Sequence, residues 1–158
     1  MDEAAKKFVL RMIPYGLYVL GAKHGEEIGL ATVNWVTQAS FSPPLVVIGV
    51  KADSTTHELL ESSKKFALSM LKSGQKDIAY TFFKHLPPEN GKVGGCAYSL
   101  AGNGAPTLDD AAGYVAGDIV EVIKRGDHSI FVGEVTEAQL HGEAEVLTLK
   151  EIGANYGG

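Results

Sequence analysis

Residues 115–140, VAGDIVEVIKRGDHSIFVGEVTEAQL, contain the two longest strand-like runs of the chain and decide its fold class. Val, Ile and Phe recur through residues 115–124 and 129–140, and the turn RGDH at 125–128 separates the two runs, a pattern typical of a β-hairpin. Residues 129–135 are apolar on both faces, which fits a small closed barrel whose outside is covered by helices or a partner subunit. The sequence therefore predicts a mainly β domain.

The rest of the chain predicts more short strands and a few helices. We expect strands at residues 17–22, 28–36, 45–50, 66–71 and 97–100, and helices at 2–12, 54–60 and 74–85, the last with Ile78, Ala79, Phe82 and Phe83 inward. Thr55 and Glu58 have the spacing of a capping box at the start of the second helix. The Gly-rich stretch 89–107 is expected to be loop around its one short strand. The 158 residues suit a single domain with one core.

Composition and charge disfavour several function classes. The net charge is −5, without a basic stripe that could follow a phosphate backbone, so we do not expect a nucleic-acid partner. No apolar run reaches membrane-spanning length and no signal peptide is visible, and the single Cys96 excludes an internal disulfide, which together favour a cytoplasmic protein away from membranes. The five histidines are scattered and none has metal-ligand spacing, so we expect no metal site, and common catalytic signatures are missing.

Residues 32–44, TVNWVTQASFSPP, form the segment most suited to ligand binding. Its hydroxyl and amide side chains lead to a bend at two prolines and offer several hydrogen-bond donors along one edge. This arrangement suits a planar heterocycle with many acceptors. An ordinary polar edge strand with Trp35 in the core is the alternative.

Two further clusters could serve a ligand. Lys51, Ser54 and Thr56 surround a predicted helix start, where free backbone N–H groups favour a terminal phosphate, although plain capping by Ser54 or Thr55 explains the same residues. His128 follows Gly126 and Asp127 at a strand end, where it could orient a substrate or move a proton; a solvent-exposed turn histidine without a role is the alternative.

In this order and spacing, the segments resemble the flavin reductase-like family, which has the FMN-binding split-barrel fold with Greek-key-like connections. The resemblance is carried by residues 16–20 (GLYVL), 32–44, Lys51 with Ser54 and Thr56, 66–71 (FALSML), 104–108 (GAPTL), and GDH at 126–128 followed by FVGEV at 131–135. It covers residues 8 to about 140, most of the chain. Residues 89–95 match the family only loosely.

The resemblance implies a function and a set of site residues. The cofactor would be FMN, or FAD, held by Thr32, Asn34, Trp35, Val36, Thr37, Ser40, Lys51, Ser54 and Thr56, with the last three at the phosphate. His128 would lie beside the flavin and help to seat NAD(P)H, which would pass hydride to the flavin. A homodimer with the flavin near the interface is also implied.

Three functions remain open from the sequence. The first is an NAD(P)H-dependent flavin reductase that passes electrons to free flavin, ferric complexes or a partner protein. A second is an electron carrier of the flavoredoxin type, with tightly held FMN and little direct NAD(P)H activity. A third is a flavin-free binding module on the same barrel.

Overall fold

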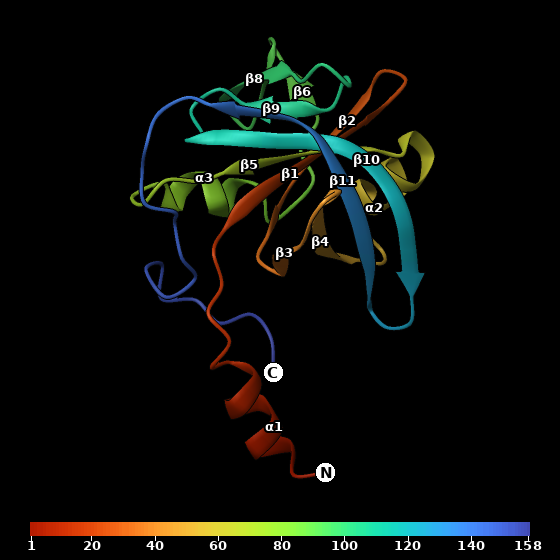
Figure 1. Cartoon of the computed structure of the whole chain (residues 1–158). Helices are drawn as coiled ribbons and strands as arrows, with labels where there is room; N and C mark the ends of the chain where they lie inside the picture. Colours follow the sequence, from red (N-terminus) through yellow and green to blue (C-terminus); the bar gives the residue numbers. More distant parts are fainter.

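The computed structural model describes all 158 residues and is built mainly from strands (Figure 1). Its three helices are α1 (Glu3–Leu10), α2 (Thr55–Ser63) and α3 (Lys76–Thr81). The strands are β1 (Tyr18–His24), β2 (Glu27–Val33), β3 (Val36–Phe41), β4 (Pro44–Lys51), β5 (Lys65–Met70), β6 (Pro88–Glu89), β7 (Lys92–Val93), β8 (Cys96–Leu100), β9 (Pro106–Leu108), β10 (Gly113–Lys124) and β11 (His128–Leu140). The prediction of a mainly β fold with short helices is confirmed.

Seven strands form one curved antiparallel sheet in the order β2-β1-β5-β10-β11-β4-β3. Two register shifts in the β10–β11 hairpin bend its long ribbon around the molecule. The two ends of the sheet are consecutive in the chain, because β2 passes directly into β3 through Asn34 and Trp35. We call this two-residue connection the kink. Its Trp35 carbonyl accepts from the Gly49 N–H of β4 at 2.8 Å, so the kink is fixed to the β4–β3 edge of the sheet.

This kink corrects one prediction. Residues 28–36 do not form one strand, since β2 ends at Val33 and β3 begins at Val36 in a different part of the sheet. The break cannot be seen in the sequence, because residues 28–36 form one continuous strand-like run. The bend is determined by the closure of the barrel and not by local propensity.

The core lies inside the curved sheet, where Phe66 and Phe131 are fully buried. Leu59 and Leu60 of α2 pack against the same cluster. A second cluster lies around β1, α3 and the segment after β11 and includes Leu17, Phe82 and Leu147. Burying side chains of this size contributes about 1.5–3 kcal/mol each, so the two clusters fix the barrel and the segments that flank it.

Residues 88–108 correct a second prediction, because they form a small antiparallel sheet, β6-β7-β8-β9, and not mostly loop. Asn90 and Gly91 adopt positive φ in the turn between β6 and β7, and Gly94 and Gly95 do so between β7 and β8. The glycines therefore allow tight turns between very short strands. Cys96 at the last turn is half-buried against the core.

α1 and α2 lie near their predicted positions, whereas the length of α3 and the cap of α2 differ from the prediction. α3 is shorter than the expected 74–85, and Phe83 is 52% exposed beside Tyr80 while Phe82 points inward. α2 is capped by Ser54, whose hydroxyl accepts from the His57 N–H, so the expected Thr55–Glu58 capping box is wrong by one position.

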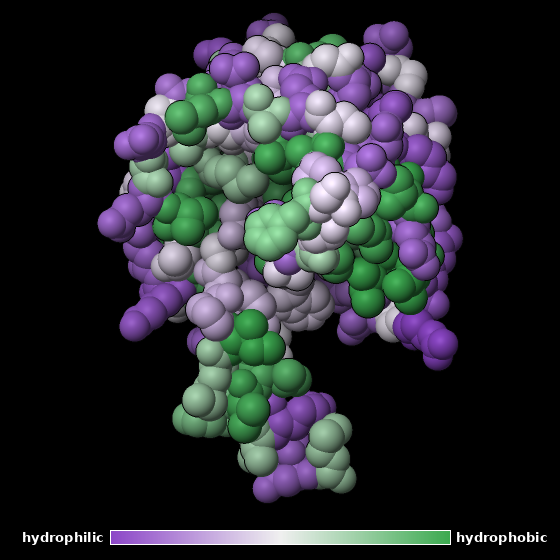
Figure 2. Space-filling view, in the orientation of Figure 1, coloured by the Kyte–Doolittle hydropathy of each residue, from purple (hydrophilic) through white to green (hydrophobic).

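α1 projects from the barrel beside the C-terminal segment (Figure 1), and none of its residues is buried. Hydrophobic side chains gather along this projection in Figure 2, and Phe8, Val9, Met12 and Ile13 are all exposed. Its apolar face therefore has no partner within the chain. None of the helices combines the length and apolar character that crossing a membrane requires.

Candidate functional site

Trp35 and His128 come together at one end of the barrel, with ring centroids 4.5 Å apart. β11 begins at His128, which pairs with Lys51 at the end of β4, and the Trp35 carbonyl is bonded to Gly49 on the same strand. A Cβ on Gly49 would lie 3.1 Å from the Trp35 Cβ, so the glycine lets Trp35 pack directly on the β4 backbone. The kink and two strand ends thus meet at one place.

His128 is held by hydrogen bonds on both ring nitrogens. Its Nδ1 lies 2.8 Å from Asp127 Oδ1 and its Nε2 lies 2.8 Å from the Tyr156 hydroxyl. The hydrogen bond to His128 lowers the pKa of Asp127, and burial raises the pKa of Tyr156. An ionised carboxylate only accepts and a protonated phenol can donate, so a neutral His128 carries its proton on Nδ1 and accepts from Tyr156 at Nε2.

The side chain of His128 is only 16% exposed. Trp35 lies on one side of it and Tyr156, whose ring centroid is 5.3 Å from that of Trp35, on another. His128 is therefore not solvent-exposed, as its alternative interpretation as an idle turn residue assumed. No local sequence pattern assigns Tyr156 to His128, since 28 residues separate them.

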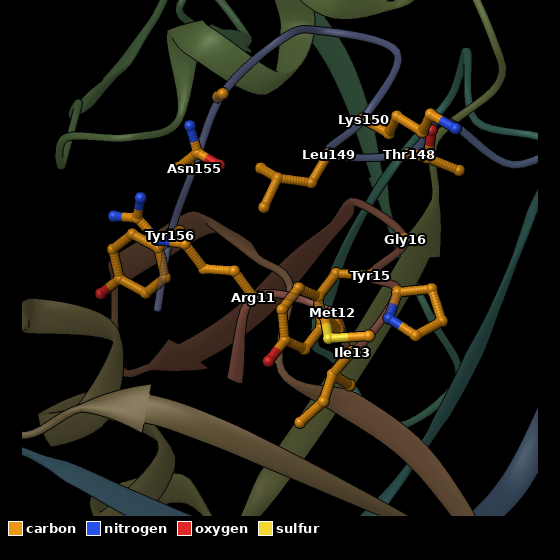
Figure 3. A pocket seen from close by; sticks show the side chains of 12 residues that line it. Arg11, Met12, Ile13, Tyr15, Gly16, Thr148, Leu149, Lys150, Asn155 and Tyr156 are labelled. Carbon is orange, nitrogen blue, oxygen red and sulfur yellow. The ribbon is translucent and has the colours of Figure 1, made fainter. Parts of the chain in front are cut away.

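A cavity of about 560 Å³ opens next to Tyr156, between the end of the α1 projection and the segment after β11 (Figure 3). Arg11 and Tyr156 lie near each other on one wall, and Thr148 and Lys150 lie opposite. The Arg11 Nε donates to the Gly157 carbonyl at 3.1 Å, which ties the two chain ends together.

Two buried donors at the kink have no acceptor, namely Asn34 Nδ2 and Trp35 Nε1. A buried N–H without a partner costs about 1–3 kcal/mol and is rare in native proteins. Each of these donors would be stabilised if a small side-chain movement brought it to an acceptor of a ligand or of water.

The expected phosphate residues are neighbours, but their side chains are used differently. Lys51 Nζ lies 3.4 Å from Asp53 Oδ1 and remains largely exposed. The Ser54 hydroxyl caps α2 and donates to the Lys51 carbonyl at 2.8 Å, as in the alternative of plain capping. Thr56 is buried, with its Oγ1 against Gly29 of β2. What remains for an anion is the exposed Lys51 ammonium, which Asp53 shares, and the backbone N–H groups at the start of α2 ahead of His57.

The other expected site residues are spread along β2 and β3. The Thr32 hydroxyl donates to the Ala79 carbonyl and ties β2 to α3. Val36 and Thr37 line a mostly apolar cavity of about 530 Å³. Ser40 pairs with Leu45, six positions along β4 from Lys51. That separation is about 20 Å at about 3.3 Å per residue, so Ser40 does not join the group around Lys51.

A second histidine, His57, forms a buried connection that the sequence did not reveal. Its Nε2 lies 2.7 Å from Ser129 Oγ and its Nδ1 lies 3.4 Å from Glu61 Oε2. Burial is the main cause that lowers the pKa of His57, which favours the neutral ring. Ser129 is only 1% exposed, so this serine, histidine and glutamate tie α2 to β11 and do not form an accessible nucleophile.

The fold and these residues can be compared with known proteins. The family model described as "Flavin reductase like domain" matches residues 10–155. The chain is 34% identical over 139 residues to the NADH-dependent FAD reductase of Streptomyces globisporus, covering 87% of this chain and 76% of that protein. It is 30% identical over 160 residues to a flavin reductase of Pseudomonas putida, covering 100% and 91%.

Several relatives are much longer than this chain. Diflavin flavoprotein A 1 of Synechocystis is 33% identical over 149 residues, but the match covers 94% of this chain and only 26% of that protein. For the high molecular weight rubredoxin of Moorella thermoacetica the match covers 62% of the relative. The chain therefore spans between about a quarter and two thirds of these proteins.

Solved structures agree with the sequence comparison. The NADH:FAD oxidoreductase of Streptomyces globisporus superposes with a TM-score of 0.71 at 34% identity, covering 81% of this chain and 76% of that one. An FMN-binding protein from Thermus thermophilus with bound p-hydroxybenzaldehyde superposes with a TM-score of 0.72 at 27% identity, covering 82% and 73%.

Proposed function

The chain belongs to the flavin reductase-like family, and on that premise we propose that it is an NAD(P)H-dependent flavin reductase that works through FMN. The observation that carries the proposal is the meeting of Trp35, His128 and Lys51 at one end of the barrel, beside two buried donors without acceptors. The names of the relatives support a nicotinamide donor and a flavin acceptor.

The residues present suit a flavin. Asn34 Nδ2 is a buried donor that needs an acceptor, and the edge of a flavin ring carries several. Lys51 and the first N–H groups of α2 would hold a terminal phosphate, which favours FMN over a flavin without one. A bound flavin supplies hydride acceptance and electron transfer, so the protein needs no nucleophile of its own.

His128 has the fixed orientation that a ligand-positioning residue requires. Asp127 accepts from its Nδ1 and thereby selects Nε2 as the nitrogen that accepts a hydrogen bond. We assign to His128 the task of orienting the nicotinamide beside the flavin, where it forms a hydrogen bond through Nε2. This contact contributes orientation, which accelerates hydride transfer without any proton being moved.

The apolar face of α1 supports a homodimer as part of this proposal. Within α1, Phe8 is 74% exposed and Val9 is 58% exposed, and a helix with such a face is stabilised by packing against another surface. A second copy of this chain supplies that surface in a closed two-fold assembly.

Two measurements test the function. The purified protein is titrated with FMN while flavin fluorescence is followed, and NADH and NADPH oxidation are measured with added free FMN. Saturable FMN binding together with fast turnover is expected. FMN binding without turnover would favour the electron-carrier alternative, and failure to bind any flavin would leave only the flavin-free module.

A further inference from the structure

Residues 155–158, which we call the C-terminal strap, lie across the face formed by Trp35 and His128. Tyr156 places its hydroxyl on His128 Nε2 and its ring against Trp35. Gly157 covers the indole, since a Cβ built on it would lie 3.7 Å from Trp35 Nε1. The strap thus occupies the one nitrogen of His128 that Asp127 leaves available.

The strap covers this face but provides no hydrogen-bond acceptor for the Trp35 indole N–H. Trp35 Nε1 is buried and has no acceptor, although Gly157 and Tyr156 lie beside it. A covered but unpaired donor opposes the closed position, because water or a ligand acceptor would pair with it once the strap moved away. The closed position therefore costs free energy at the site that it covers.

The attachments of the strap are few. One hydrogen bond joins Tyr156 to His128 and one joins Arg11 to the Gly157 carbonyl, and the two donors, Tyr156 and Arg11, are both exposed residues. The Tyr156 side chain remains 45% exposed. Gly153 precedes the strap with φ +68° and Gly157 lies within it with φ +119°, both conformations that glycine adopts readily. Such a segment opens at a small cost in contacts.

We propose that Tyr156 is an intramolecular competitor for the aromatic ligand of this site: its ring and hydroxyl hold the place beside Trp35 and His128 that a planar ring with a hydrogen-bonding substituent takes. The identification of that ring as a reduced nicotinamide rests on the proposed function. Ligand binding requires the strap to open, and the observed affinity is reduced by the fraction of molecules in which the strap is closed.

Tyr156 therefore sets the apparent affinity for the nicotinamide and not the rate of the hydride step. A neutral hydrogen bond of the Tyr156–His128 kind corresponds to about three- to tenfold in an equilibrium constant. We expect Tyr156→Phe to lower the KM for NADH about threefold and Tyr156→Ala about tenfold. The kcat should change by less than about twofold, since the competing contact is already broken in the bound complex.

The closed strap has a readout that needs neither flavin nor nicotinamide. Trp35 is the single tryptophan of the chain, so acrylamide quenching of intrinsic fluorescence reports its exposure alone. Tyr156→Ala is expected to raise the quenching constant severalfold. Arg11→Ala, which removes the second attachment without touching Trp35, should raise it less.

Tyr80→Ala is the matched control, because Tyr80 is also 45% exposed but lies in α3 beside Phe83. It should leave both the quenching constant and the KM unchanged. Unchanged quenching in Tyr156→Ala would overturn the inference. A higher KM for NADH in that variant would also overturn it, since Tyr156 would then be part of the binding surface. If the unaltered protein does not oxidise NADH, the proposed function fails, while a rise in Trp35 quenching still supports the strap.

Discussion

Lys51→Gln tests whether the end of β4 holds the phosphate of FMN. Lys51 is the one site cation that stays available, and its side chain is 61% exposed, with Asp53 3.4 Å from the ammonium. Two unit charges about 4 Å apart in water interact by about 1 kcal/mol, and a phosphate carries about −1.5 to −2 charges near neutral pH. We therefore expect a loss of about 1–2 kcal/mol, which is about five- to thirtyfold in Kd for FMN.

Riboflavin provides the control, because it carries the same ring without the phosphate. Titration of both proteins with both flavins, followed by flavin fluorescence, isolates the coupling between Lys51 and the phosphate. Lys51→Gln should weaken FMN and leave riboflavin unchanged. The difference should shrink at high salt, since the contact is exposed. Asp53→Asn, which removes the competing carboxylate, should tighten FMN about twofold.

The result that refutes this reasoning is equal weakening of FMN and riboflavin by Lys51→Gln, or no change for either. Equal weakening would mean that Lys51 supports the shape of the site and does not meet the phosphate. No change would move the phosphate away from the start of α2.

Three more predictions concern stability and assembly. The pKa of His57 is lowered by burial, so the folded protein disfavours the charged ring. The contribution of His57 to stability is therefore complete above the ordinary histidine pKa of about 6.5 and is lost as the pH falls below it. His57→Gln should flatten the dependence of Tm on pH between about 6.5 and 5. Gly21→Ala would place a Cβ 2.0 Å from the Pro106 carbonyl oxygen, so we expect a Tm about 5–10 °C lower by calorimetry, while Gly142→Ala, with open space around it, should change Tm little. Phe8→Glu places a charge on the apolar face of α1 and should convert a dimer to a monomer in sedimentation equilibrium; an unchanged mass would remove α1 from the interface.

The strands with the clearest patterns could be predicted within a few residues, as the β10–β11 hairpin shows. Those at the closure of the barrel could not. Residues 28–36 have uniform strand propensity, yet the chain leaves one edge of the sheet at Val33 and joins the other at Val36. Local sequence patterns do not show where the chain crosses from one edge of the sheet to the other, because that position depends on how the whole barrel closes.

For the candidate site, the sequence supplied Trp35, Lys51 and His128, through the ligand chemistry of their segments together with the resemblance to the flavin reductase-like family. The structure brings these three together, and it also shows that Ser40 lies about 20 Å along the strand from Lys51 and that the Thr32 hydroxyl is bonded to α3. Hydroxyl side chains that look equivalent in the sequence differ in the structure, because some already form hydrogen bonds within the protein and others remain able to bind a ligand.

The sequence by itself determined the class of the fold and the segments from which the site is made, since hydrophobic periodicity and turn residues act over a few neighbouring positions. Only the tertiary structure decided that Tyr156 lies on His128, that Arg11 holds Gly157, and that His57 is buried against Ser129. These contacts join residues from 28 to 146 positions apart, and each exists because the closure of the barrel brings distant strand ends and both chain ends to the same place.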